Sequence, residues 1–319
     1  MSIRSTCLYL ANLLVVAAFG CSPHKPGKDS EALLLTAYTT AGSKVYRIGA
    51  DGKDRKELFK STDGVNYIYV SGNSTRGPLV VVKREHKNGI PEDQINLCEL
   101  ESEGCQPIAE TEHGYKGYGV LSPDNRQVVF SMSPPEPYGR HRLWVFELET
   151  RKTQQLTKDT PADSQSWDSY PLWRPDGKEI AFIRATRDAS GGKIATSLQH
   201  IPASGGEPTP LLSTNEPIAG YCYSPDGSRL AAFTSRGLDL IDLSSGDRTT
   251  LLAWGSIPDR MFRASGMVWF PLRNTIAFAL HNDKTNEFEL WSVPADGKPA
   301  SVLYKQPAVQ ITISSSLSS

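Results

Sequence analysis

The stretch Trp173-Arg174-Pro175-Asp176-Gly177-Lys178-Glu179-Ile180-Ala181-Phe182 places a Pro-Asp-Gly turn between two apolar segments. Proline presets its own backbone angle for a tight turn and glycine accepts a positive φ, so the two segments are expected to pair as a hairpin. Related stretches are centred on prolines spaced 46 to 52 residues apart, namely Pro123, Pro175, Pro225 and Pro271. A repeat of this period indicates that one structural unit is used several times.

Each repeat unit contains four predicted strands. The proline turn joins the first two strands, and in the unit of Pro123 the third is expected over Arg142–Leu148 and the fourth over Gln154–Thr157. A four-stranded antiparallel sheet of this size cannot bury both faces alone, so it has to stack against neighbouring sheets around an axis. The repeat therefore predicts an all-β fold, a β-propeller of four-stranded antiparallel blades.

Counting the units predicts six blades. A degenerate unit over residues 64–109 precedes the four that carry the prolines, and before it only three strands are predicted, at 33–38, 44–48 and 56–59. The missing innermost strand is expected from the C-terminal end, where Ala308–Thr312 alternates as a strand should. Pairing of the N- and C-terminal strands would close the ring and remove its exposed edges.

The turn Ser224-Pro225-Asp226-Gly227 and the strand end Ile180-Ala181-Phe182 resemble the repeat of TolB-like propellers, which are relatives of WD-repeat blades. The resemblance covers residues 64–305 and weakens at Pro271, which Asp-Gly does not follow. It implies the propeller alone, without the N-terminal α/β domain of TolB. It also implies a partner that is an envelope protein or is associated with peptidoglycan.

The composition is that of an ordinary globular protein with balanced charge. The chain has 319 residues, of which 39% are hydrophobic, and its 34 basic and 35 acidic residues give a net charge of −1. All-β rings of this length commonly form one domain. Nothing in the charge balance predicts a nucleic-acid partner or binding to an anionic membrane surface.

The N-terminus has the pattern of an export signal. Arg4 precedes the apolar run Leu8–Phe19, which is too short for a membrane span. The following Ala18-Phe19-Gly20-Cys21 resembles a bacterial lipobox, in which the cysteine becomes the lipidated first residue. A plain cleaved signal peptide is the alternative, because Phe19 stands where a small residue is usual. Since Ser22 rather than aspartate follows the cysteine, we expect an outer-membrane lipoprotein that faces the periplasm and is attached only by its N-terminal lipid.

These patterns divide the chain into four segments. We expect a signal peptide over residues 1–20, and a lipidated Cys21 with a flexible tether over 21–31. The propeller is expected over 32–314 and a disordered tail over 315–319. The tether is predicted from its Pro, Lys and Gly content, which disfavours a packed structure.

Two cysteines flank a predicted hairpin turn. Cys98 and Cys105 enclose six residues, so their side chains are expected to oppose each other. In an oxidising compartment this pair is a candidate disulfide, and two unpaired thiols are the alternative. A zinc site is not predicted, because a single C-x₆-C pair without a second pair is not a zinc pattern.

The loops differ in length between the two faces of the predicted disc. The turns within strand pairs one–two and three–four are tight, whereas the connections on the opposite face, such as Arg84–Asp93 and Lys158–Tyr170, are predicted to be long. Function usually resides on such loops, and aromatic and arginine side chains dominate interfaces. We therefore predict a partner-binding face. Its candidate residues are Tyr115, Tyr118, Tyr138, Arg140, His141, Trp167, Asp168, Tyr170, Arg187, Trp254, Arg260 and Arg263. The alternative for members such as Trp167 and Tyr170 is packing between blades.

No known catalytic motif is found in the sequence. It has no G-x-S-x-G element, and its six histidines form neither H-x-H nor H-E-x-x-H. We therefore predict a non-catalytic binding scaffold that needs no metal or cofactor. The rival is a propeller enzyme, a metal-dependent lyase or hydrolase acting on carbohydrate or another small substrate. It would use His86, His141 and His281, which fall in equivalent loops of three predicted blades.

Overall fold

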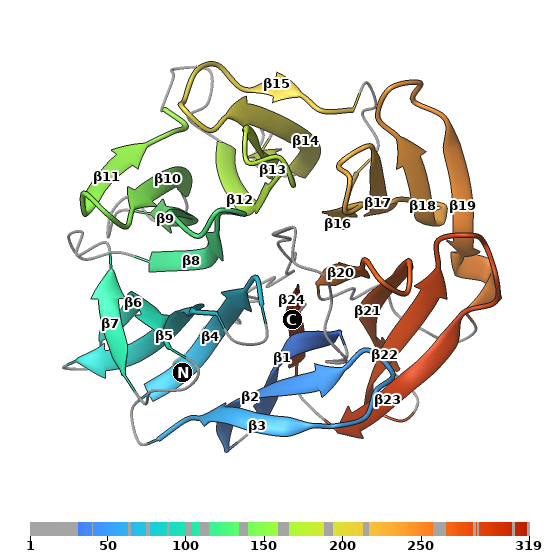
Figure 1. Cartoon of the computed structure of the whole chain (residues 1–319), viewed down its shortest axis with the longest axis horizontal. Helices are drawn as coiled ribbons and strands as arrows, with labels where there is room; N and C mark the ends of the chain where they lie inside the picture. The colour runs from blue at the N-terminus through green and yellow to red at the C-terminus, as the bar shows by residue number, and fades with distance from the viewer. Residues whose placement is uncertain are drawn as a thin grey trace, which may run out of the picture.

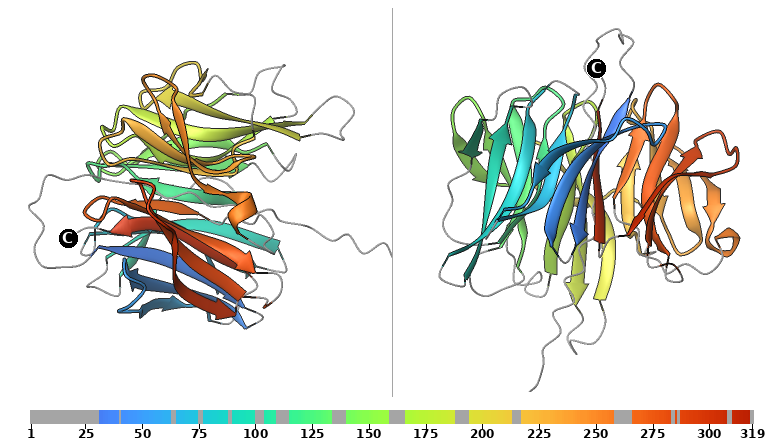
Figure 2. Two further views of the ribbon diagram at one scale, coloured as in Figure 1. Left: turned by 90° about the vertical axis from the view of Figure 1, so that its right-hand side faces the viewer. Right: turned by 90° about the horizontal axis from the view of Figure 1, so that it is seen from below.

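A computed structural model arranges the chain as a ring of six β-sheets around a central axis (Figure 1). It describes residues 31–317 except 40, 63–64, 75–76, 88–89, 100–103, 109–114, 134–139, 159–165, 188–193, 213–216, 258–265, 283–284, 286 and 308–309. The predicted signal peptide, Cys21 and the tether up to residue 30 therefore lie outside the described residues. The edge-on views of Figure 2 show the blades side by side in a disc.

Each blade is a four-stranded antiparallel sheet, which confirms the predicted fold class. The strands of blades 1 to 3 are β1 (Ala32–Thr39), β2 (Gly42–Gly49), β3 (Lys56–Lys60), β4 (Val65–Gly72), β5 (Leu79–Lys87), β6 (Ile90–Cys98), β7 (Cys105–Ile108), β8 (Tyr115–Leu121), β9 (Gln127–Ser133), β10 (Arg142–Glu147) and β11 (Lys152–Gln155).

The same order continues through the second half of the chain. The elements of blades 4 to 6, with the closing strand last, are β12 (Ser166–Trp173), β13 (Glu179–Arg187), β14 (Ile194–Pro202), β15 (Thr209–Pro210), β16 (Gly220–Tyr223), β17 (Arg229–Phe233), β18 (Gly237–Asp242), β19 (Arg248–Ala253), the 3₁₀ turn η2 (Trp254–Ser256), β20 (Met267–Phe270), β21 (Thr275–Asn282), β22 (Glu287–Pro294), β23 (Ser301–Pro307) and β24 (Gln310–Leu317).

The two ends of the chain close the ring, as predicted. β24 is the innermost strand of blade 1 and pairs antiparallel with β1, from Tyr38↔Gln310 to Ala32↔Leu317. The strand thus extends three residues beyond position 314, so the predicted disordered tail is wrong for residues 315–317. The backbone of Ala32–Leu34 needs partners there, and the serines of the tail provide them through main-chain hydrogen bonds that do not depend on side-chain type.

The Ser-Pro-Asp-Gly turns are self-contained hydrogen-bonded units. In blade 5 the Ser224 hydroxyl accepts from the Arg229 amide at 2.9 Å and donates to Asp226 Oδ1 at 2.5 Å. The same carboxylate oxygen accepts from the Ser228 amide at 3.1 Å, and the pKa of Asp226 is lowered chiefly by the Ser224 hydroxyl. Asp226 thus stabilises its own turn through local hydrogen bonds.

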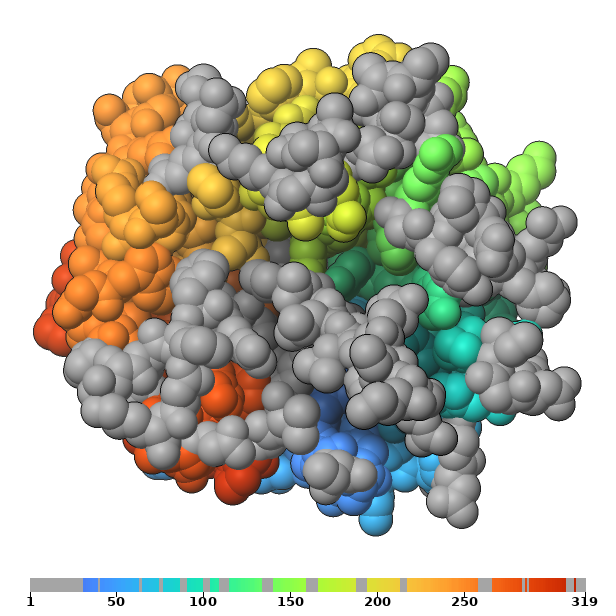
Figure 3. All heavy atoms as spheres, turned by 180° about the vertical axis from the view of Figure 1, so that it is seen from behind, coloured from blue at the N-terminus to red at the C-terminus, as the bar shows by residue number. Residues whose placement is uncertain are grey.

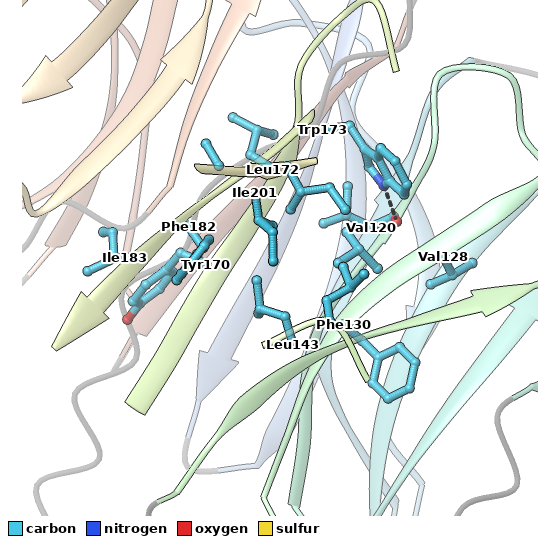
Figure 4. Packing of buried hydrophobic residues seen from close by; sticks show 14 of the residues in the cluster. Val120, Val128, Phe130, Leu143, Tyr170, Leu172, Trp173, Phe182, Ile183 and Ile201 are labelled. Atoms are coloured by element: carbon cyan, nitrogen blue, oxygen red, sulfur yellow. Dashed lines mark hydrogen bonds between the residues drawn. The ribbon is translucent and has the colours of Figure 1, made fainter. Parts of the chain in front are cut away.

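Adjacent blades pack through the apolar faces of their sheets. The residues between blades 3 and 4 include Val120, Phe130, Leu143, Leu172 and Trp173, which are shown in Figure 4. Trp173 lies 1% exposed and donates its indole N–H to the Val120 carbonyl at 3.1 Å, so its polar atom is satisfied across the blade boundary. Burial of this kind, repeated around the ring, supplies most of the stability of the scaffold.

One connection differs from its prediction. Arg84–Asp93 is not a long loop, because β5 and β6 continue as a paired ladder to Lys87↔Ile90. The sequence between these residues contains Asn88-Gly89, a pair typical of two-residue hairpins. Arg84 and Asp93 therefore face each other across two rigid strands.

Gly177 tests the backbone requirement of the repeat turn. Its φ is +70°, and a methyl group added there would meet only Pro123 Cδ, at 3.9 Å. Gly177→Ala should therefore lower the free energy of unfolding by about 1 kcal/mol through backbone strain rather than through a clash. Urea unfolding measures the change. Gly255→Ala is the control, since it has no neighbour within 4 Å and no positive φ, and it should not destabilise. Equal stability of the two variants would contradict the strain argument.

Candidate functional site

The two faces of the disc are chemically different. We call the face with the Ser-Pro-Asp-Gly turns the turn face, and the opposite face, shown in Figure 3, the loop face. Near the loop face, blades 2 to 4 contain a group of charged and tyrosine side chains close to the axis. We call it the channel arc. It consists of Arg84, Asp93, Lys116, Tyr118, His141, Asp168, Tyr170 and Arg184.

The first part of the arc is a forked ion pair within blade 2. Arg84 donates from Nε to Asp93 Oδ1 at 2.7 Å and from Nη2 to Oδ2 at 2.9 Å. The Asp93 side chain is 1% exposed whereas that of Arg84 is 34% exposed. Hydrogen bonding to Asp93 raises the pKa of Arg84 further. The guanidinium is thus held rigidly from beneath, with part of its edge at the surface.

Blade 3 adds two basic side chains around the same carboxylate. The Lys116 amide donates to Asp93 Oδ2 at 3.2 Å, and its ammonium donates to the Asp93 carbonyl oxygen, also at 3.2 Å. Burial lowers the pKa of Lys116, and Asp93 and Glu92 oppose that shift. Burial also lowers the pKa of His141, with Asp93 opposing and Arg142 reinforcing the shift.

A second forked pair lies in blade 4. Arg184 donates from Nε and Nη2 to the two carboxylate oxygens of Asp168 at 2.7 and 2.9 Å, and Asp168 is fully buried. The amide of Asp168 donates to the His141 carbonyl at 2.9 Å, and Arg142 donates to the Ser166 carbonyl at 2.9 Å. These bonds tie blade 3 to blade 4, as the Lys116 contacts tie blade 2 to blade 3.

Two tyrosines with left-handed backbones line the arc toward the axis. Tyr118 has φ +54° and Tyr170 has φ +58°, at bulges in the innermost strands of blades 3 and 4. Their rings lie 4.6 Å apart, and burial raises the pKa of Tyr118 to about 12. The Tyr170 carbonyl accepts from the Tyr221 hydroxyl at 2.7 Å. Positive φ is uncommon for such residues, and strained positions concentrate at functional sites.

The candidate binding residues are distributed unevenly. Arg140 and Arg187 are exposed, and Tyr115, Tyr118, His141, Trp167 and Trp254 are half-buried. Asp168 and Tyr170 are buried, so they position and pack rather than present a surface. Trp254 stacks on Phe233 at 5.3 Å and donates to the Thr234 carbonyl at 2.9 Å, which is a packing role. Tyr138, Arg260 and Arg263 lie outside the described residues.

The sequence reasoning missed Arg84, Asp93, Lys116 and Arg184. The sequence predicts a loop over Arg84–Asp93, whereas the structure places both residues on paired strands, and no sequence motif marks Lys116. A signal was present nonetheless, because Arg184 follows Pro175 by nine positions, immediately after the apolar strand end that defines the repeat. A charged side chain at the end of an otherwise buried strand is costly to bury unless an opposite charge lies beside it, and here the neighbouring strand provides the Asp168 carboxylate.

The three loop histidines occupy different settings. His86 is exposed at the end of β5, His141 lies beside the Asp93 cluster, and the ring of His281 packs on Phe288 at 4.9 Å. Within the described part of the chain, no three His, Cys, Asp or Glu side chains form a group that could hold a metal ion.

Cys98 and Cys105 are joined by a disulfide at the outer edge of blade 2. Their Cα atoms are 4.1 Å apart, and the two residues are direct partners in the β6–β7 ladder. Cys222 is a buried free thiol whose pKa is raised by burial. Over the residues that the structure describes, no helix has the length and apolar character needed to span a membrane.

The fold is a six-bladed β-propeller, and it is similar to the propeller of TolB. No family model and no curated protein sequence matches the chain. Among solved structures, TolB from Acinetobacter baumannii is 18% identical with a TM-score of 0.67, and the match covers 91% of this chain and 67% of that one.

Two other solved structures illustrate the range of proteins with this fold. A chain of a nidogen–laminin complex is 11% identical, with a TM-score of 0.62 and coverage of 90% of this chain and 98% of that one. An oligogalacturonate lyase in complex with manganese is 15% identical, with a TM-score of 0.55 and coverage of 89% and 75%. At these identities the likeness establishes the fold alone, and the same fold serves both binding proteins and enzymes.

The buried pair in blade 4 should be structurally essential. Asp168→Asn removes the carboxylate charge that pairs with the partly buried Arg184 guanidinium, and the expected loss is about 3 kcal/mol in the free energy of unfolding. Asp296→Asn is the control, because Asp296 pairs with Lys298 at 2.7 Å on the exposed turn face, and it should leave the melting temperature unchanged. Urea and thermal unfolding of both variants measure the difference. An Asp168→Asn variant as stable as its control would contradict the assignment.

Proposed function

We propose that this chain is a non-catalytic binding scaffold of the bacterial cell envelope, which holds a protein or a peptidoglycan-associated partner on its loop face. The observation that carries the proposal is the pair of guanidinium groups of Arg84 and Arg184, each fixed by a buried aspartate on the rigid strands of blades 2 and 4. Groups fixed in this way lose little conformational entropy when they bind, which favours affinity and specificity.

The surroundings of the arc suit a macromolecular partner. Arg140 precedes β10 and Arg187 ends β13, so both are exposed at the loop-face ends of neighbouring blades. The half-buried Trp167 lies on β12 and pairs with Ala185 of β13. Arginine and tryptophan are enriched among residues that dominate interface energies. An interface that includes these positions and the arc would span three blades, as expected for a protein surface rather than for a small substrate.

Comparison with other propellers is compatible with this proposal. The nidogen–laminin structure shows the same fold within a complex of proteins. The manganese-containing lyase has a similar fold and is an enzyme, so a catalytic function is the second candidate. A metal-dependent lyase or hydrolase would require stoichiometric metal, which elemental analysis of the purified protein detects, together with loss of that metal on replacing His141 and His281.

The disulfide supports an extracytoplasmic location. Structural disulfides persist in oxidising compartments such as the periplasm and are rare in the reducing cytosol. The pair Cys98–Cys105 therefore agrees with the export signal and lipobox predicted from residues 1–21. We accordingly propose an outer-membrane lipoprotein facing the periplasm, attached through Cys21.

Charge reversal on the loop face tests partner binding. The double variant Arg140→Glu/Arg187→Glu changes two exposed residues, so it should keep the wild-type melting temperature while reducing capture of the partner about tenfold or more. Capture is measured by chemical crosslinking in cells, purification of the chain and quantitative mass spectrometry.

The matched control reverses two exposed cations of the turn face, Arg151→Glu/Lys298→Glu. It should capture the same partner as the wild type. Equal loss in both double variants would indicate a non-specific charge effect, and no loss in either would place the interface elsewhere.

Membrane attachment has its own test. In the native host the wild-type chain should fractionate with membranes, resist extraction by high salt and dissolve in detergent, because an acyl anchor is held by the hydrophobic effect. Cys21→Ser should appear in the soluble periplasmic fraction. Intact mass of the purified mature chain provides the second readout, since lipid on residue 21 has a distinctive mass. A Cys21→Ser variant that stays in the membrane fraction would refute the anchor.

A further inference from the structure

The Asp93 cluster contains more positive than negative groups. Arg84 and Lys116 both contact Asp93, and His141 lies close enough for Asp93 to act on its pKa. The other described charged groups acting on these side chains are Glu92, beside Lys116, and Arg142, beside His141. Two carboxylates therefore lie among two arginines, one lysine and one imidazole. The net charge of the cluster is positive, so one further negative charge would be attracted to it.

Arg84 is the group best placed to receive that charge. A guanidinium has five N–H donors, and the two bonds to Asp93 use two of them. The remaining edge belongs to a side chain that is 34% exposed, and the guanidinium carbon lies 5.4 Å from the centre of the Tyr115 ring. Because Asp93 and the aromatic ring restrict its rotation, the free edge has a defined direction, as forked recognition of a second carboxylate requires.

We propose that the partner presents an acidic protein segment to the loop face and places one of its carboxylates against Arg84, with Lys116 and His141 beside it. This inference rests on the proposed function and names the chemistry of the partner at that site. A protein segment fits better than a small anion, because the exposed Arg140 of blade 3 and Arg187 of blade 4 also lie at the loop-face ends of their blades. A single small anion would leave those residues unused.

Binding should be coupled to protonation of His141. Burial lowers the pKa of His141 below its ordinary value of 6.5 in the free protein, so the imidazole is neutral at pH 7. A second carboxylate opposes this shift just as Asp93 does, and it raises the pKa of His141. The complex therefore takes up a proton, and affinity should increase as the pH falls through this range.

The test is calorimetric titration of the purified full chain with a triglutamate peptide blocked at both ends, at pH 6 and pH 8. The triglutamine peptide is the neutral control, and inorganic phosphate and galacturonate probe the other anion classes. Triglutamate should bind, more tightly at pH 6, and triglutamine should not. The NMR-measured pKa of His141 should rise on addition of triglutamate.

Arg84→Lys keeps the charge opposite Asp93 but removes the fork, so it should weaken triglutamate binding about tenfold while the chain remains folded. Arg126→Lys on the turn face is the matched control and should bind like the wild type. The inference is overturned if Arg84→Lys binds equally well, if the His141 pKa does not move, or if phosphate or galacturonate binds as tightly as triglutamate.

The two proposals fail in different ways. In one outcome, Arg140→Glu/Arg187→Glu loses the cellular partner, Arg84→Lys captures it normally and triglutamate does not bind. The loop face then still binds a partner, and only the proposed recognition of an acidic segment by Arg84 is wrong. If triglutamate binds Arg84 as expected but neither variant alters cellular capture, the carboxylate site exists and the proposed loop-face interface with the cellular partner is wrong.

Discussion

The pairing of β24 with β1 is the interaction on which the remaining structure depends. It joins residues from opposite ends of the chain in a single sheet and converts six separate blades into a closed ring. Glu31 strengthens the junction, since its buried carboxylate accepts from the amides of Leu272 and Arg273 in the turn of blade 6. In a closed ring every blade is held from both sides, so side chains contributed by blades 2, 3 and 4 keep fixed relative positions. Without closure the channel arc would have no rigid frame.

The ring also explains why the two faces carry different chemistry. On the turn face each aspartate is used locally, and the pKa of Asp242 falls to about 2 because its own turn donates hydroxyl and amide hydrogens to it. Such residues have little capacity left for a partner. On the loop face Asp93 and Asp168 are buried beneath arginines and bridge between strands. The acids are buried there, whereas the side chains of Arg84 and Arg184 are 34% and 16% exposed.

The sequence predicted the fold far better than the site, for a physical reason. Turn chemistry is local, so Pro-Asp-Gly spacing revealed the blades, their number and even the source of the missing strand. The arc depends on which strands become neighbours. Lys116 and Asp93 are 23 residues apart and meet only because β8 stacks on blade 2. The sequence predicts Tyr118 and Tyr170 as members of a binding face. In the structure, bulges in their strands bring the two rings together near the axis. The disulfide partners were within reach of sequence reasoning because a hairpin is again local.

The energetics of buried ion pairs support the proposed binding role of the arc more than a stabilising role. A buried pair of charges recovers roughly its desolvation cost and is often no better for stability than apolar residues of the same volume. The repeat has such residues available, since Leu280 occupies in blade 6 the position that Arg184 holds in blade 4, and it is fully buried. Blades 2 and 4 instead carry arginine at that position, each fixed by a buried aspartate. Stability alone could have been met by the apolar residue that the repeat already uses, so the arginines at this position support the proposed binding role.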